Sequence, residues 1–460
     1  MIHGQAVTQK IELVQRFHSP FKFPTMSVSV ASSFLPSTNV LAIKILPSVT
    51  TGVRRPFHLA LTIDTSGSMD GPRIQAVKRT LHLLIDAMAD DDVLSLISYS
   101  HESQIDANAT VLSEVTRPVL HEIVNRLEAN GGTNMESAFV ALGSVASPAI
   151  DAVFLLTDGQ INQGISVSSG LQRILGSILA PGTPVNTLGF GADHNIRLLR
   201  DMAMRSRGSY TYADADEMLP AIIGDIMGGL ATETGRNGVL TIPAGWRCLE
   251  LGCEANDTQY VVGTLIAEKE QWIVLEGPED ASASGSPTFQ FQWSCGAATH
   301  VEIHTTGDTI PAIVVAEQRD RVHVAGVFSR VTDMLENNQT AEAKTALTEL
   351  GNYLDSSTAK GRPFVIRLHA QVDEMLDMIS SYPVLGPPPL MRGFGGTVPE
   401  PPLLAPALSR MASNTAALGV QRGFFTNGAG AIEGSYSSPT QAHNRRVIST
   451  GYTQLAEHDI

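Results

Sequence analysis

The stretch from residue 59 to residue 69 constrains the fold of this chain more than any other part of it. Residues 59–63 are apolar or β-prone, the run ends in Asp64, and two hydroxyls follow at alternate positions, Ser66 and Ser68. In open α/β sheets, binding sites lie at the carboxyl ends of the strands. Carboxylate and hydroxyl oxygens suit a hard divalent cation, Mg²⁺ before Zn²⁺. The stretch therefore predicts a buried strand that ends in a metal-binding loop.

Two later segments place further oxygen ligands in similar settings. Thr133 follows a pair of glycines on a loop before a helical pattern, and Asp158 ends an apolar run over residues 153–157. Simpler interpretations exist: Thr133 caps the helix that follows, Asp158 forms an Asp-Gly turn, and Ser66 and Ser68 cap the next helix. The joint occurrence of all three segments, in this order, favours the metal interpretation.

Together these segments resemble the metal-ion-dependent adhesion site of a von Willebrand factor A (vWA) domain. The resemblance implies direct metal ligation by Ser66, Ser68 and Thr133, with Asp64 and Asp158 acting through water. We expect Mg²⁺, with Mn²⁺ or Ca²⁺ as alternatives. Because hydroxyl ligands are neutral, they leave the ion under-neutralised, and one position stays open for an Asp or Glu of a protein partner.

The surrounding periodicity supports an α/β fold class. Strand and helix patterns alternate over residues 56–233, which predicts a mostly parallel sheet with crossover helices. The order of these elements resembles that of a vWA domain, which implies a Rossmann-like domain with helices on both faces of the sheet. Period-two runs over residues 234–315 predict an antiparallel β-sandwich. A hairpin at residues 26–55 is expected to join this sandwich, so that the vWA domain would be an insertion between its strands.

The remaining segments differ in composition. Three amphipathic stripes over residues 316–382 predict a small helical bundle. Residues 1–25 show no clear period and are assigned to an N-terminal extension. Residues 383–460 are rich in Pro, Gly and Ser and are predicted to form an extended tail.

Composition excludes several classes of partner. The formal net charge is -15 and the pI is near 5.3, so no basic surface is expected for nucleic acid or anionic membrane. No run of about 18 apolar residues occurs, which argues against a membrane span. The start of the chain does not resemble a secretory signal, and three cysteines are too few for a disulfide framework. We expect a cytoplasmic protein.

The segment order is also similar to a subgroup of vWA proteins that carry flanking β-strands and a C-terminal helical region, some with a RING finger and others with a Hint domain. This chain has neither a RING-like cysteine set nor a Hint-like block. Phosphate-loop, H-E-x-x-H and G-x-S-x-G motifs are missing too, so we expect no enzyme activity. The sequence favours a divalent-cation-dependent protein-interaction module. One alternative is a structural or assembly protein that self-associates through the sandwich, helices or tail into a homo-oligomer. The other, by family analogy, is an adaptor in ubiquitin-related machinery.

Overall fold

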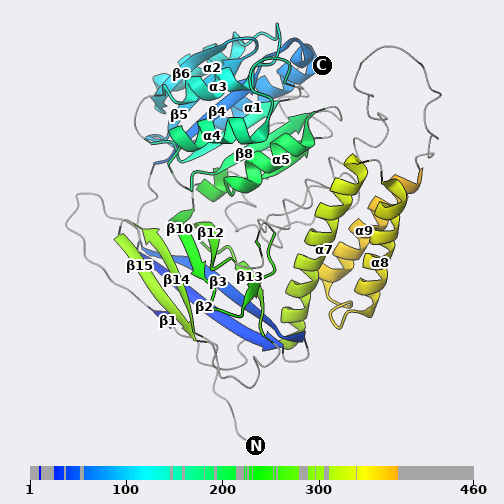
Figure 1. The fold of residues 1–460 in the computed structure, drawn as a ribbon. Coiled ribbons are helices and arrows are strands. Elements are labelled where there is room, and N and C mark those ends of the chain that lie inside the picture. Colours follow the sequence, from blue (N-terminus) through cyan, green and yellow to red (C-terminus); the bar gives the residue numbers. More distant parts are fainter. Residues whose placement is uncertain are drawn as a thin grey trace, which may run out of the picture.

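The computed structural model describes residues 10–11, 25–35, 38–51, 56–145, 149–157, 161–180, 182–190, 194–213, 222, 224, 227–230, 232–251, 253–254, 257–278, 288–295, 297–304, 310–337 and 339–381. Within this part the chain forms an α/β domain, two antiparallel sheets and a group of three helices (Figure 1). The predicted tail at residues 383–460 and most of the predicted N-terminal extension lie outside the described residues, as does Asp158.

The α/β domain is built on a six-stranded sheet in the order β6-β5-β4-β7-β8-β9. The β5–β6 pair is antiparallel and every other pair is parallel. The strands are β4 (His58–Asp64), β5 (Val93–Tyr99), β6 (Ser103–Val111), β7 (Ala152–Thr157), β8 (Val185–Phe190) and β9 (Tyr210–Ala213). All residues of β4 and β7 are buried, as expected for central strands of a parallel sheet covered on both faces.

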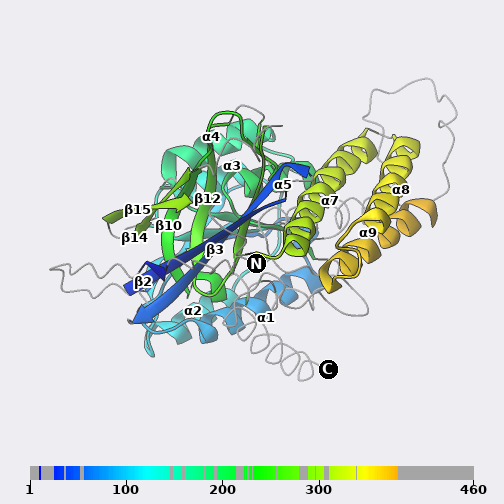
Figure 2. The ribbon, with the colours of Figure 1, turned by 90° about the horizontal axis from the view of Figure 1, so that it is seen from below.

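Helices cover both faces of this sheet. α1 (Pro72–Ala87) and α2 (Thr116–Asn125) pack on one face, with Leu81, Leu84 and Leu120 in its core. α3 (Met135–Leu142), α4 (Ser168–Ile178) and α5 (Ile196–Arg205) pack on the other. Figure 2 shows the two groups on opposite sides of the domain. This arrangement confirms the predicted fold class.

Two antiparallel sheets lie below the α/β domain in Figure 1. One has the order β1-β2-β3-β13-β11 and the other β12-β10-β14-β15. Their strands are β1 (Lys10–Ile11), β2 (Thr25–Leu35), β3 (Val40–Thr51), β10 (Glu233–Thr241), β11 (Arg247–Cys248), β12 (Gln259–Ile266), β13 (Gln271–Glu276), β14 (Thr288–Cys295) and β15 (Ala297–His304). The residues of β3 and β13 that face the second sheet form one apolar cluster with residues of β10, β12 and β14.

The α/β domain interrupts the first of these sheets in the sequence. β3 precedes the domain and β13 follows it, yet the two strands pair side by side, with Ile45 opposite Gln271 and Val40 opposite Glu276. The chain therefore leaves the sheet, builds the α/β domain, and returns to complete the same sheet.

Three helices complete the described part: α7 (Ala312–Glu336), α8 (Thr340–Ser356) and α9 (Pro363–Ser381). α7 contacts β2, β3 and β13 on the side of their sheet away from the second sheet. A fully buried ion pair fixes this contact, because Arg321 of α7 donates to both carboxylate oxygens of Glu250. Among the described residues, no helix combines the length and apolarity needed to span a bilayer.

Candidate metal centre

Asp64 stands at the carboxyl end of β4, at the centre of the sheet, and its side chain is fully buried. Carboxylate oxygen Oδ1 accepts a hydrogen bond from the Ser66 backbone N–H at 2.9 Å, and Oδ2 accepts one from the Thr157 hydroxyl at 2.6 Å. A buried carboxylate needs such donors or a cation nearby, because its charge is costly away from water. These bonds also fix the orientation of the group at the tip of the strand.

The two serines of the loop place their hydroxyls together. Ser66 is buried and Ser68 is exposed, and their Oγ atoms lie 3.1 Å apart. Two adjacent ligands of an octahedral Mg²⁺ at its usual bond length are separated by about 2.9 Å. The observed spacing therefore fits two ligands of one such ion. The short 3-10 turn Gly67–Met69 sets this spacing, and its residue Met69 is buried.

The glycine loop that carries Thr133 lies against the serine loop. The N–H of Gly67 donates to the carbonyl of Gly131 at 3.1 Å, and the N–H of Asn130 donates to the carbonyl of Thr65 at 2.7 Å. Gly131 has φ +73°, and a Cβ there would lie 2.7 Å from Nδ1 of His101. The two loops therefore meet through backbone bonds at a position that favours glycine.

A third loop, which follows β7, reaches the same place. The Asn162 side chain accepts a hydrogen bond from the Thr133 N–H at 2.9 Å, and the N–H groups of Asn162 and Gln163 donate to the Thr133 carbonyl. Thr157, the last residue of β7, donates to Asp64. The structure thus brings together the loops of Asp64, Ser66, Ser68 and Thr133, while Asp158 falls outside the described residues.

The capping interpretations of these residues do not describe the structure. The N-cap of α1 is Gly71, without a side-chain cap, so neither serine caps that helix. Asn134, and not Thr133, caps α3, where its side chain accepts from the Ser137 N–H. The hydroxyls of Ser66, Ser68 and Thr133 are therefore not explained as helix caps. Among the described residues, no group of three or more His, Cys, Asp or Glu side chains could hold a metal ion.

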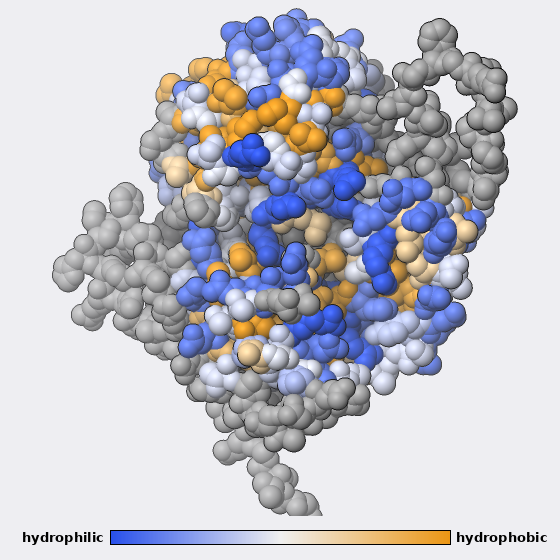
Figure 3. Space-filling model, in the orientation of Figure 1, coloured by the Kyte–Doolittle hydropathy of each residue, from blue (hydrophilic) through white to orange (hydrophobic). Residues whose placement is uncertain are grey.

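The surface next to the loops combines polar and apolar parts. A cavity of about 480 Å³ is lined by Thr65, Tyr99, Asp106, Asn130 and neighbouring residues. Burial raises the pKa of Asp106, although the Ser98 N–H and the Gln104 amide donate to it. On the face shown in Figure 3, apolar side chains gather over α3 and α4, where Val140 is 59% exposed and, just before α4, Val167 is 64% exposed.

Comparison with known proteins identifies the class of the α/β domain. Residues 58–225 match the model of the von Willebrand factor type A domain. An uncharacterized protein of Synechocystis sp., sll0103, is 32% identical over 168 residues, which cover 35% of this chain and 38% of that protein. Inter-alpha-trypsin inhibitor heavy chain H3 of Homo sapiens is 27% identical over 194 residues, which cover 38% of this chain and 22% of that protein. The chain therefore contains a vWA domain and spans well under half the length of these relatives.

Solved structures share the fold over a larger part of the chain. The von Willebrand factor type A protein from Catenulispora acidiphila has a TM-score of 0.60 at 18% identity, covering 79% of this chain and 91% of that one. The ArnB paralog VWA2 from Sulfolobus acidocaldarius has a TM-score of 0.54 at 14% identity, covering 86% and 99%. These likenesses concern the fold alone. vWA domains are mostly non-enzymatic interaction modules, and no catalytic family is indicated.

Proposed function

We propose that this protein is a divalent-cation-dependent protein-interaction module, in which a metal ion at the vWA loops accepts an acidic side chain of a partner. The observation that carries the proposal is the convergence of the Ser66 and Ser68 hydroxyls, 3.1 Å apart, beside the buried carboxylate of Asp64. Ser66, Ser68 and Thr133 would hold the ion directly, and Asp64 and Asp158 would act through water. We propose Mg²⁺ as the ion, with Mn²⁺ or Ca²⁺ as alternatives.

The electrostatics of the loop favour an anionic partner group. When bound, the ion would supply a Lewis-acidic position for a carboxylate. The hydroxyl ligands do not neutralise its charge, so a partner's Asp or Glu gains a strong contact. Arg73, at the start of α1, donates to the Ser68 carbonyl at 3.3 Å and places a second positive charge beside the loop. Val140 on α3 and Val167 just before α4 are exposed apolar side chains of the same domain, and exposed apolar surface is common on interaction faces.

Calorimetric titration of the metal-stripped protein with Mg²⁺ and Mn²⁺ tests the metal part of the proposal. We expect wild-type binding, and loss of binding in Asp64→Asn and Ser68→Ala. Asp70→Asn is the matched control, because Asp70 is an exposed carboxylate two residues after Ser68 that the proposal leaves without a role. Equal binding by Asp64→Asn and the wild type, both folded by circular dichroism, would contradict the proposal.

A second titration tests the partner part. Short peptides with one central Glu are added to the Mg²⁺-loaded protein, with Gln versions as matched controls. We expect binding of the Glu peptides that chelation abolishes. Binding of Glu and Gln peptides with equal affinity would leave the metal site without its proposed use.

The domain boundaries given by the sequence stay predictions, as does an intracellular place of action. The proposed self-association through the tail concerns residues outside the described part, and sedimentation of the chain with and without residues 383–460 tests it. We propose no enzymatic reaction, and the adaptor function remains an analogy.

A further inference from the structure

Two histidines face each other between α1 and α2, on the side of the vWA sheet that these helices cover. His82 lies on α1 and His121 on α2, and their Nδ1 atoms are 2.6 Å apart. The ring centroids are 4.9 Å apart with an interplanar angle of 29°, so the two rings lie end to end with their Nδ1 atoms facing each other. Both side chains are half-buried. Two ring nitrogens at this distance must share a proton or repel each other.

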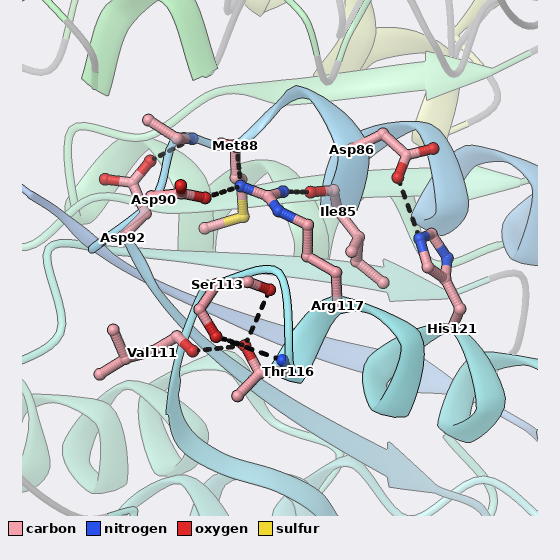
Figure 4. A network of polar contacts seen from close by, with 11 residues as sticks. Ile85, Asp86, Met88, Asp90, Asp92, Val111, Ser113, Thr116, Arg117 and His121 are labelled. Atoms are coloured by element: carbon pink, nitrogen blue, oxygen red, sulfur yellow. Dashed lines mark hydrogen bonds and ion pairs between the residues drawn. The ribbon is translucent and has the colours of Figure 1, made fainter.

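The outer nitrogens of both rings determine where the protons lie. Nε2 of His82 contacts Oδ1 of Asn125 at 3.0 Å, and Nε2 of His121 contacts Oδ1 of Asp86 at 2.9 Å. Figure 4 shows His121 reaching from α2 to Asp86 on α1. Both partner atoms are acceptors, so both Nε2 atoms carry hydrogen. When the rings are neutral, each Nδ1 then has a bare lone pair, and the two lone pairs face each other.

We propose that His82 and His121 hold a single proton between their Nδ1 atoms, which makes the pair a proton-dependent latch between α1 and α2. A shared N–H⁺···N bond explains the short distance, because one positive charge replaces the repulsion of two lone pairs. The pair then behaves as one coupled site with two separated protonation steps. The first proton closes the latch, and the second would place two imidazolium ions against each other.

Burial and the nearby positive groups act against the second proton, and Asp86 acts in its favour. Burial lowers the pKa of His82 below its ordinary value, and positive charge on His121 and Lys78 lowers it further, while the hydrogen bond to Asn125 and the charge of Asp86 raise it. Arg117 of α2, one turn before His121, is held at the end of α1 by the carbonyl oxygens of Ile85 and Met88 and by Asp90 (Figure 4). The latch therefore opens on the acid side.

The position of the latch connects it to the metal loops. α1 begins directly after the loop of Ser66 and Ser68, and α2 leads into the loop of Gly131 and Thr133. The latch forms with or without a bound metal ion, since it concerns the contact between two helices. Its failure would leave the proposed function untouched, and the reverse also holds.

Nitrogen NMR of the histidine rings in the full chain, recorded between about pH 4 and pH 8, tests the proposal. We expect protonated Nε2 atoms on both rings at neutral pH and two separated titration steps for the pair. In His121→Gln, His82 should titrate in a single step, and this step should lie at higher pH than the second protonation step of the wild-type pair. His369→Gln is the matched control, because His369 pairs with Asp373 on its own helix.

A neutral His82 with hydrogen on Nδ1 and a bare Nε2 would overturn the proposal, as would unchanged titration of His82 in His121→Gln. Asn125→Asp keeps the acceptor for His82 Nε2 and should preserve the two steps.

Stability gives a second measurement that is independent of the NMR. In acid, the unfolded state binds a proton that the native state does not bind. The folding equilibrium constant then falls by up to about tenfold for each pH unit below the ordinary histidine pKa. We expect this acid loss in the wild type and a smaller one in His121→Gln, and equal losses would contradict the latch.

Discussion

At the scale of single residues, the glycine loop shows how much the candidate site depends on backbone conformation. Gly131 has φ +73°, and a methyl group there would lie 2.7 Å from Nδ1 of His101. We expect Gly131→Ala to lower the free energy of unfolding by about 1–3 kcal/mol, because alanine pays for a left-handed conformation and a close contact. Denaturant titration measures the change.

The control for this substitution is a glycine with free space. Gly176 lies in α4, and nothing is within 4 Å of a Cβ placed there. Gly176→Ala should leave the protein equally stable or more stable by about 0.5–1 kcal/mol, since alanine favours helix. Similar destabilisation in both variants would show that the geometry of the loop is not the cause.

Some residues of the site belong to one short segment of the sequence, and others are brought to it from distant segments. Asp64, Ser66 and Ser68 follow from a local motif at the end of a strand, and the structure places all three together. Thr157, by contrast, donates to Asp64 across 93 residues, and Asn162 joins Thr133 across 29. A threonine at a strand end and an asparagine on a loop carry no local signal of these contacts. Only the order of strands in the sheet creates them.

At the scale of elements, the contact of α7 with the sandwich rests on a buried ion pair. Arg321 and Glu250 are both almost completely buried, and the Val274 N–H also donates to Glu250. We expect Arg321→Met to destabilise the protein by about 3–5 kcal/mol, because it leaves the Glu250 charge buried without a cation. Thermal and denaturant unfolding measure this change.

An exposed pair of the same chemistry gives the comparison. Arg126, the C-cap residue of α2, and Glu122 on that helix are 73% and 62% exposed. Arg126→Met should change stability by less than about 0.5 kcal/mol, because water screens the pair. The double variant Arg321→Met with Glu250→Gln should recover part of the loss. No recovery in the double variant would mean that packing of the arginine, and not its charge, holds α7 in place.

Elements with a strong period could be predicted from the sequence, and those with weak periods could not. The strands β4, β5 and β7 and the three C-terminal helices follow from continuous apolar runs or helical stripes. β6 could not be predicted, because it is an edge strand whose residues are mostly half-exposed. The same holds for β10, which lies between β12 and β14. β10 contains register shifts around Gly235 and Gly238, and Asn237 has φ +53°, so its sequence lacks the alternation of a regular strand.

At the scale of the whole molecule, arginines connect the vWA domain to the sheets beneath it. Arg236 of β10 pairs with one carboxylate oxygen of the buried Asp151, which lies just before β7. The other carboxylate oxygen of Asp151 accepts a hydrogen bond from the His58 N–H at 2.7 Å. We expect Arg236→Met to weaken this joint by about 1–3 kcal/mol, because it leaves a buried carboxylate without its cation. In calorimetry, unfolding of the vWA domain should then separate from that of the sandwich.

The matching control is Arg247→Met. Arg247 pairs with Glu276 within the sandwich at 52% and 41% exposure, so its loss should leave the unfolding profile unchanged. A single unshifted transition in Arg236→Met would mean that other contacts, such as Arg207 over the Tyr260 ring at 5.1 Å, hold the domains together.

The return of the chain from β13 to β3 sets the order in which the protein can mature on the ribosome. Ile45 of β3 can pair with Gln271 only after β13 has been synthesised. One edge of β3 therefore stays unpaired, and the first sheet incomplete, while the whole vWA domain is synthesised. The vWA strands pair over shorter separations and can close first. During this interval β3 offers an open edge to other nascent chains, and the early completion of the vWA domain brings the two separated strands within reach of each other.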